Sequence, residues 1–175
     1  MALFQPYESF LINYPLGSFG SIYVSEDNVV KVFEPILEYE FLHIEKFLRE
    51  VIYYSSLKHE LIIGMVAFSF SSDKKCLYLA MPKGISIVDA VRKGFTSIEE
   101  VSNDLLSVLL FLEENNLVHN DIKHLNLVYH EGKTKLIDFG LSAPSYPCEQ
   151  GNYFNQPLYT FSFRDYYRKE NLDKN

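Results

Sequence analysis

Short β-prone runs of apolar residues, separated by polar turns, occupy the first third of the chain and predict strands. The β-prone runs Ser21–Val24 and Val29–Phe33 are separated by a polar turn at residues 26–28, so the pair predicts a β-hairpin. Two more strands are predicted over Ile62–Phe70 and Cys76–Met81, on either side of a short polar segment. This part of the chain is therefore expected to form an antiparallel sheet.

Apolar residues at helical spacing predict two long helices. The first lies within residues 36–57, and the second begins at Ser97, where Glu100 three positions later completes a capping box. Two short β-like runs follow, Leu125–Tyr129 and Thr134–Ile137. Strands around one helix, followed by a helix and short strands, predict an α+β fold.

Composition narrows the class of protein. The chain has 175 residues, 47% of them hydrophobic, which favours one folded domain. A net charge of −7 argues against a protein that binds nucleic acid or anionic lipid. Residues 1–10 lack the pattern of a signal peptide, and no apolar run is long enough to span a bilayer. We therefore expect a cytoplasmic protein without membrane contact. Cys76 and Cys148 neither require nor exclude one disulfide.

The densest chemistry lies in residues 119–126, His-Asn-Asp-Ile-Lys-His-Leu-Asn, followed by Asp138-Phe139-Gly140. Asp121 and Asn126 are five positions apart and can converge on a loop, where a helix would separate them. Carboxylate and amide oxygens suit a hard cation such as Mg²⁺. The ammonium group of Lys123 could neutralise charge on a phosphoryl group.

These residues resemble the catalytic loop (H-x-D-x-K-x-x-N) and the D-F-G motif of eukaryotic-type protein kinases. The resemblance implies a protein-kinase fold with a strand-rich N-lobe and a shortened helical C-lobe. It also implies ATP and Mg²⁺ as cofactors, with Asp121 accepting the substrate proton and Asn126 and Asp138 holding the metal. Lys123 after Asp121 resembles the serine/threonine group. An isolated Asp-Phe-Gly turn would be a weak signal.

Two residues near the start extend the resemblance. Lys31, in Val-Val-Lys, resembles the strand lysine that binds the α- and β-phosphates, and Glu50 resembles the glutamate that pairs with it. Glu50 could instead be a solvated helix charge, and acidic residues between Glu34 and Glu45 could take its place. The spacing to Lys31 and to the later Lys58-His59 favours Glu50.

The adenine and phosphate contacts are implied by the same resemblance. Met81 corresponds to the gatekeeper before a hinge at 82–84, and Ile22 and Val128 would enclose adenine. The glycine-rich loop is a weaker match because Pro15 stands at its first glycine. Its expected ATP-binding residues are Leu16, Gly17, Ser18, Phe19 and Gly20.

Three departures from the family pattern affect regulation and the substrate lobe. Asn120 replaces the usual arginine, so control through a phosphorylated activation loop is not expected. Val29 replaces a smaller residue above adenine. No A-P-E motif follows Gly140, and the chain stops where the central helix of the large lobe would begin. The expected parts are an N-lobe (1–81), a hinge (82–84), a partial C-lobe (85–143) and a tail (144–175). A shortened kinase of this kind resembles the small kinase-like proteins of large DNA viruses.

The tail is rich in aromatic residues in a chain that has 13 Tyr, 14 Phe and no Trp. A shortened C-lobe would leave the underside of the 97–115 helix exposed, and such a surface usually has a partner. The tail rings could cover that surface or form a homodimer; alternatively, the segment is disordered. The rings are Tyr146, Tyr153, Phe154, Tyr159, Phe161, Phe163, Tyr166 and Tyr167.

Three functions are compatible with these motifs. The leading one is Mg-ATP-dependent phosphorylation of serine or threonine in a protein substrate. The second is a catalytically weak binding or decoy module that engages a partner kinase. The third is a small-molecule phosphotransferase of the aminoglycoside-kinase type, which Lys123 disfavours because those enzymes tend to place histidine there.

Overall fold

The computed structural model describes four stretches of the chain: residues 12–15, 21–33, 40–71 and 76–145. The chain divides into two units, which we call unit 1 (1–84) and unit 2 (85–175). The division follows Gly84, the last residue of the expected hinge. The glycine-rich turn at 16–20, Cys148 and the tail aromatics lie outside the described residues.

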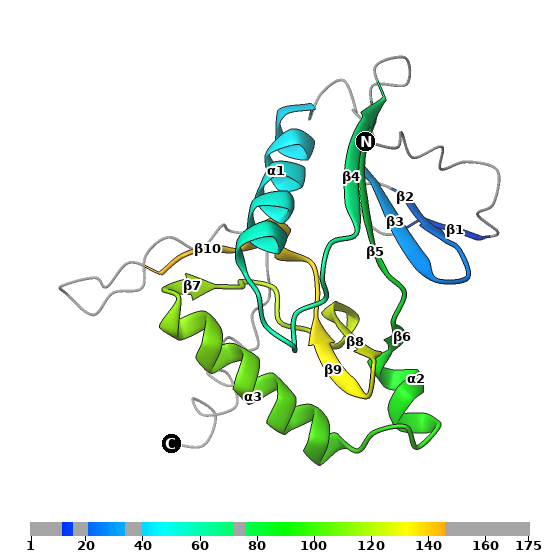
Figure 1. Cartoon of the computed structure of the whole chain (residues 1–175), viewed down its shortest axis with the longest axis vertical. Helices are drawn as coiled ribbons and strands as arrows, with labels where there is room; N and C mark the ends of the chain where they lie inside the picture. The colour runs from blue at the N-terminus through cyan, green and yellow to red at the C-terminus, as the bar shows by residue number, and fades with distance from the viewer. Residues whose placement is uncertain (1–11, 16–20, 34–39, 72–75, 146–175) are drawn as a thin grey trace, which may run out of the picture. The chain divides into compact units, whose positions relative to one another are not determined.

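Unit 1 is built on a five-stranded antiparallel sheet in the order β1-β2-β3-β5-β4 (Figure 1). The predicted hairpin of β2 and β3 is confirmed. Its turn is closed by the backbone N–H of Ser25, which donates to the carbonyl oxygen of Asn28 at 2.8 Å. The strands are β1 (Ile12–Pro15), β2 (Ser21–Val24), β3 (Asn28–Phe33), β4 (Ala67–Ser71) and β5 (Cys76–Pro82).

Alternation along β3 separates two buried environments. Val30 and Val32 pack with Tyr78 and Ala80 of β5 on one face of the sheet. Helix α1 (Glu40–Ser56) lies against the other face, where the ring of Phe33 meets the ring of Phe47 edge to face at 5.5 Å between centroids. Successive strand residues point to opposite faces, so Lys31 shares the face of Phe33 that α1 covers.

The strand predicted over Ile62–Phe70 begins later than expected. The structure has β4 only from Ala67, while residues 61–63 form a buried turn after α1 in which the N–H of Ile62 donates to the carbonyl oxygen of His59 at 3.1 Å. An apolar run indicates burial, and it does not by itself distinguish a strand from a buried turn. The early start of that strand is therefore wrong.

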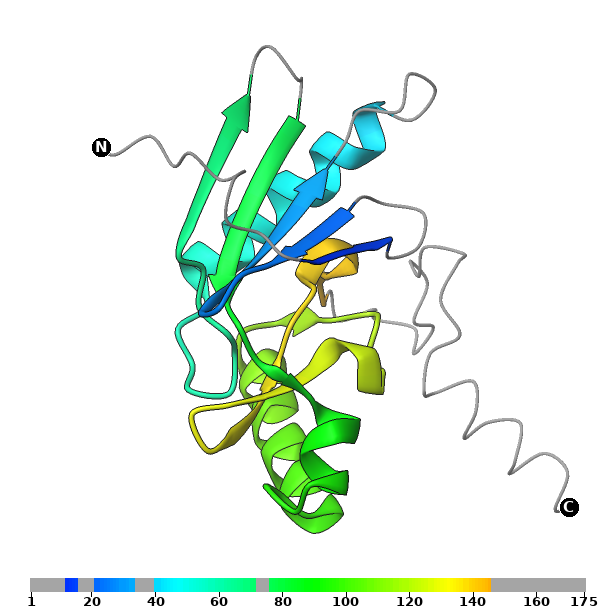
Figure 2. The same cartoon turned by 90° about the vertical axis from the view of Figure 1, so that its right-hand side faces the viewer.

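The described part of unit 2 combines α-helices with small antiparallel sheets (Figure 2). The sheets have the orders β6-β8-β9 and β10-β7. Helix α2 spans six residues, which is too short for a periodic signal, and the sequence did not predict it. The elements are β6 (Ile85–Ser86), α2 (Ile87–Arg92), α3 (Ile98–Glu114), β7 (Leu117–Val118), η2 (His124–Asn126), β8 (Leu127–His130), β9 (Lys133–Leu136), η3 (Phe139–Leu141) and β10 (Ala143–Pro144).

Helix α3 begins as predicted. The Ser97 hydroxyl accepts from the N–H of Glu100 at 3.2 Å, and the Glu100 carboxylate accepts from the N–H of Ser97 at 2.8 Å, which completes the capping box. The helix packs on β9 and buries Val108 and Leu112, whereas Leu106 and Leu110 are more than half exposed. No helix among the described residues combines the length and apolarity needed to cross a membrane.

Candidate active site

Lys31 occupies the centre of the unit 1 sheet. Its cross-strand partners are Ile22 on β2 and Leu79 on β5. Met81 pairs with Val29, two residues before Lys31, and therefore lies on the same face of the sheet. Three of the predicted nucleotide-binding residues, Ile22, Lys31 and Met81, thus share one face of unit 1.

The partner of Lys31 is Glu50 on α1. The Lys31 ammonium forms an ion pair with the Glu50 Oε1 atom, and it also lies 5.0 Å from the centre of the Phe33 ring. Glu50 is 0% exposed, and the Lys31 side chain is 16% exposed. Both charges are therefore largely removed from water, where the loss of one member of an ion pair is costly for the other.

The loop between β7 and β8 gathers the other predicted residues. The Lys123 ammonium lies 2.8 Å from the Asp121 Oδ2 atom. The Asn126 side-chain Nδ2 donates to the Asp121 backbone carbonyl at 2.8 Å and to its Oδ2 atom at 2.9 Å. Asn126 is 4% exposed, so it acts as a buried clamp on the Asp121 carboxylate.

His119 supports this loop, a role that the sequence reasoning did not assign. Its Nδ1 atom accepts from the N–H of Asp121 at 3.3 Å, and its Nε2 atom lies 3.1 Å from the Ile137 carbonyl oxygen. A carbonyl only accepts, so Nε2 carries the hydrogen and the ring is neutral. Burial lowers the pKa of His119, which agrees with that neutral form. The ring also meets Phe139 edge to face at 4.9 Å.

Asn120 and Asp138 adopt left-handed backbone conformations, with φ of 65° and 67°. Asn and Asp tolerate this region better than other residues with a side chain, because their short polar groups bond locally. The Asn120 Nδ2 atom donates to the Leu141 carbonyl oxygen at 3.1 Å, which ties the loop to the segment after Asp138. The position that carries arginine in the family pattern therefore has a structural contact here.

Asn126 and Asp138 offer the oxygen ligands that Mg²⁺ prefers. The Asn126 Nδ2 atom donates both of its hydrogen bonds to Asp121. The Asn126 side-chain oxygen lies on the other side of the amide and can act as an acceptor. The N–H of Ile137 donates to the Asn126 backbone oxygen at 3.0 Å. Asp138 is the next residue after Ile137, so this bond brings the backbone at Asp138 near Asn126. One carboxylate and one amide oxygen fit a cation that keeps waters and substrate oxygens in its shell.

The remaining predicted residues are distributed between the units. Val128 lies on β8 of unit 2, paired with Ser86 of β6 and Lys135 of β9. Leu16, Gly17, Ser18, Phe19 and Gly20 fall outside the described residues. Among the predicted residues that the structure describes, Lys31 and Glu50 thus form a charged pair in unit 1. Asp121, Lys123 and Asn126 form a hydrogen-bonded group in unit 2.

Comparison with known proteins finds the same family over most of the chain. Residues 17–167 match the family model described as protein kinase domain. The calcium-dependent protein kinase 3 of Plasmodium yoelii yoelii is 25% identical over 138 residues, which are 73% of this chain and 26% of the relative. Aurora kinase B of Xenopus tropicalis is 30% identical over 156 residues, which are 79% and 42% of the two chains.

Solved structures agree on the fold. The crystal structure of WbdD superimposes with a TM-score of 0.62 at 20% identity, over 79% of this chain and 34% of the WbdD chain. At that identity the likeness shows the fold alone. The chain spans about a quarter of the length of the two calcium-dependent protein kinases 3 that it matches, from Plasmodium yoelii yoelii and Plasmodium berghei.

Proposed function

The chain belongs to the protein kinase family, and on that premise we propose that it transfers the γ-phosphoryl group of ATP to serine or threonine hydroxyls of proteins with the help of Mg²⁺. The observation that carries this proposal is the loop that holds Asp121, Lys123 and Asn126 in one hydrogen-bonded group. Phosphoryl transfer depends mainly on position and charge, and this loop supplies both.

Asp121 is the proton acceptor in this proposal. Its Oδ2 atom is held by Asn126 and Lys123, and its backbone N–H donates to the neutral His119 ring. A fixed carboxylate can accept the proton of a substrate hydroxyl as that oxygen attacks phosphorus. Lys123 is 45% exposed, so its ammonium can move from Asp121 to the developing charge on the phosphoryl group.

Lys31 orients the phosphates. The buried Glu50 carboxylate fixes the direction of the Lys31 side chain, and the ammonium can then hold phosphate oxygens as a point charge. Asn126 and Asp138 would hold Mg²⁺, which supplies charge neutralisation at the phosphates when it is bound.

Serine or threonine is favoured as the acceptor for two reasons. Lys123 stands two residues after Asp121, as in the serine/threonine pattern. A relative named serine/threonine-protein kinase STY46, from Arabidopsis thaliana, is 26% identical over 137 residues. The partner that this function needs is a protein with an accessible hydroxyl side chain.

The test is transfer of labelled phosphate from ATP to generic protein substrates by the full chain with Mg²⁺. Asp121→Asn should lower the initial rate by roughly 10²-fold or more, because it removes the proton acceptor. Asp27→Asn is the matched control, because it makes the same chemical change in the exposed turn before β3. The Asp27 side chain has no described hydrogen bond, so this variant should transfer phosphate at the unaltered rate.

Two outcomes would contradict the proposal. Equal rates for the Asp121→Asn variant and the unaltered chain would remove Asp121 from the reaction. Nucleotide-dependent thermal stabilisation without any transfer would instead favour a binding module that engages another kinase.

A further inference from the structure

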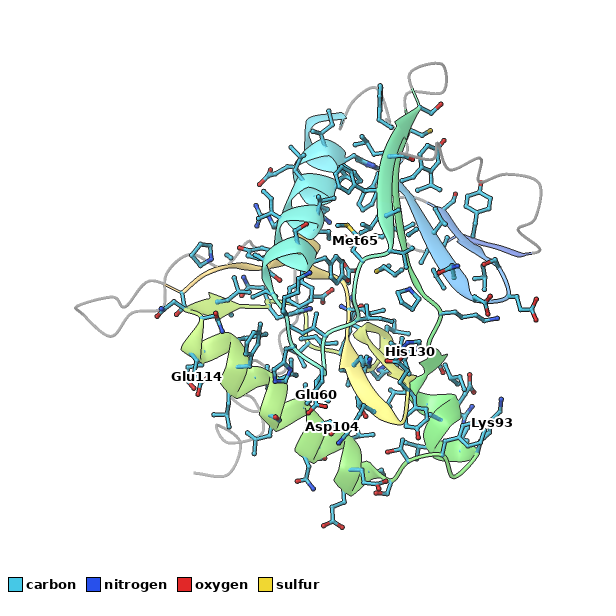
Figure 3. The ribbon with its side chains drawn as sticks, viewed as in Figure 1. Glu60, Met65, Lys93, Asp104, Glu114 and His130 are labelled. Carbon is cyan, nitrogen blue, oxygen red and sulfur yellow. The ribbon has the colours of Figure 1, made fainter. Side chains whose placement is uncertain are left out.

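Unit 2 contains a cavity of about 270 Å³. Its lining includes none of the predicted catalytic, ATP-binding or metal-binding residues. Its walls come from the segment before α3, the first two turns of α3 and the β8–β9 hairpin. Figure 3 labels Asp104, which lies on α3 beside β9. The lining residues are Phe95, Thr96, Glu100, Asn103, Asp104, Tyr129, Gly132 and Lys133.

One wall of the cavity is aromatic. The rings of Phe95 and Tyr129 stack with 6.3 Å between their centroids and 23° between their planes. Phe95 is 50% exposed, although it is a large apolar residue. An exposed, fixed ring face is a surface on which a planar cation can stack.

Glu100 supplies a second wall with an unused oxygen. Among the described residues, every hydrogen bond to Glu100 ends on its Oε2 atom: the N–H and hydroxyl of Ser97 and the hydroxyl of Thr96. These bonds lower the pKa of Glu100, so the group is charged at neutral pH. The capping box therefore fixes this carboxylate and leaves Oε1 available to a ligand.

Asp104 adds a second carboxylate. Its Oδ2 atom accepts from the N–H of Thr134 at 2.9 Å, and its Oδ1 atom lies 3.7 Å from the Lys133 ammonium. That ion pair is longer than a charge-assisted hydrogen bond, and Lys133 is 49% exposed. Lys133 can therefore withdraw into water when a better-placed cation arrives.

We propose that this cavity binds an arginine side chain carried by a protein or peptide partner. A guanidinium group is planar, stacks on aromatic rings and donates two parallel hydrogen bonds to a carboxylate. The cavity offers aromatic rings and two carboxylates against one lysine. The site needs neither nucleotide nor phosphoryl transfer, so it goes beyond the proposed kinase function.

Binding of acetyl-arginine-amide to the ¹⁵N-labelled full chain tests the proposal, with acetyl-citrulline-amide as the uncharged probe of the same shape. Amide shifts should change in residues 95–104 and 129–134, with a dissociation constant in the millimolar range for arginine. Glu100→Gln should weaken binding roughly tenfold, because it removes the charge and keeps the capping box.

Glu99→Gln is the matched control. It removes the same charge from the same exposed helix turn, but Glu99 does not line the cavity, and binding should not change. Equal shifts with citrulline, equal losses in the Glu99 and Glu100 variants, or no saturable shift with arginine would each overturn the proposal. A binding loss confined to Glu100→Gln, together with weaker citrulline binding, would support it.

Discussion

The two units hold their functional groups by different physical means. In unit 1, Lys31 and Glu50 project from a central strand and a long helix and meet as a buried ion pair. In unit 2, Asp121, Lys123 and Asn126 lie on a loop that hydrogen bonds keep in shape. The first site is fixed by packing of regular elements, and the second by satisfaction of local polar groups.

The difference sets how each site should respond to substitution. A buried charge that loses its partner remains out of water and is costly. A loop carboxylate such as Asp121, with a side chain 12% exposed, can be partly resolvated when one bond is lost. We therefore expect larger stability changes in unit 1 than in unit 2 for removal of one polar partner.

The largest effect is expected for Lys31→Met. The substitution leaves the Glu50 carboxylate buried without its ion pair and should lower the free energy of unfolding by about 3–5 kcal/mol. Chemical denaturation measures this change. The double variant Lys31→Met/Glu50→Leu should recover most of the loss, because it removes both charges; no recovery would show that volume and not charge is responsible.

A smaller effect is expected for Asn126→Ala. It removes two hydrogen bonds to Asp121, one of them to a charged oxygen, and should cost about 1–3 kcal/mol in the same denaturation experiment. Asn103→Ala, at an exposed α3 residue without a described hydrogen bond, should not destabilise the protein. If Asn126→Ala costs more than Lys31→Met, the contrast between the units is wrong.

The smallest effect is a pH dependence that comes from His119. Burial lowers the pKa of His119 in the folded protein, so at mildly acidic pH the unfolded chain binds a proton that the folded chain does not. Stability should therefore fall as pH drops below the unfolded value of about 6.5, by at most about 1.4 kcal/mol per pH unit for this group.

His119→Gln isolates that contribution. The variant cannot titrate at this position, so its stability should fall less steeply between pH 6.5 and the lower pKa of the folded histidine. Glu100 and Glu131 also have lowered pKa values, but they titrate in both proteins and cancel in the comparison. Parallel curves for the two proteins would show that His119 is not held neutral by burial.

Regular elements with strong local signals could be predicted from the sequence. Two β-prone runs on either side of a polar turn identified the hairpin with Lys31, and the Ser97–Glu100 spacing identified the start of α3. The spacing from Lys31 also selected Glu50 from several acidic residues, and the structure has that contact. These features depend on residue types at fixed spacings along the chain, which can be found in a single sequence.

Features that depend on tertiary contacts could not be predicted. The apolar residues at 61–63 are buried in a turn and not in a strand. The neutral tautomer of His119 is set by its bond to the Ile137 carbonyl oxygen, and Ile137 comes close to His119 only in the folded chain. The sequence marks Asn120 only as a departure from the usual arginine, and the structure alone shows its left-handed backbone and its bond to Leu141.

The most direct test of the central claim is the initial rate of phosphate transfer from Mg-ATP to a protein substrate in a double-variant cycle. Lys31→Arg keeps the charge in unit 1, and Asp138→Asn keeps a residue that tolerates the left-handed backbone in unit 2. Each single variant should be slower by roughly 10²-fold or more, and the double variant should be no slower than the slower single one, because both residues serve the same proposed transfer step. A single variant with an unchanged rate, or fully multiplicative losses in the double variant, would contradict the account.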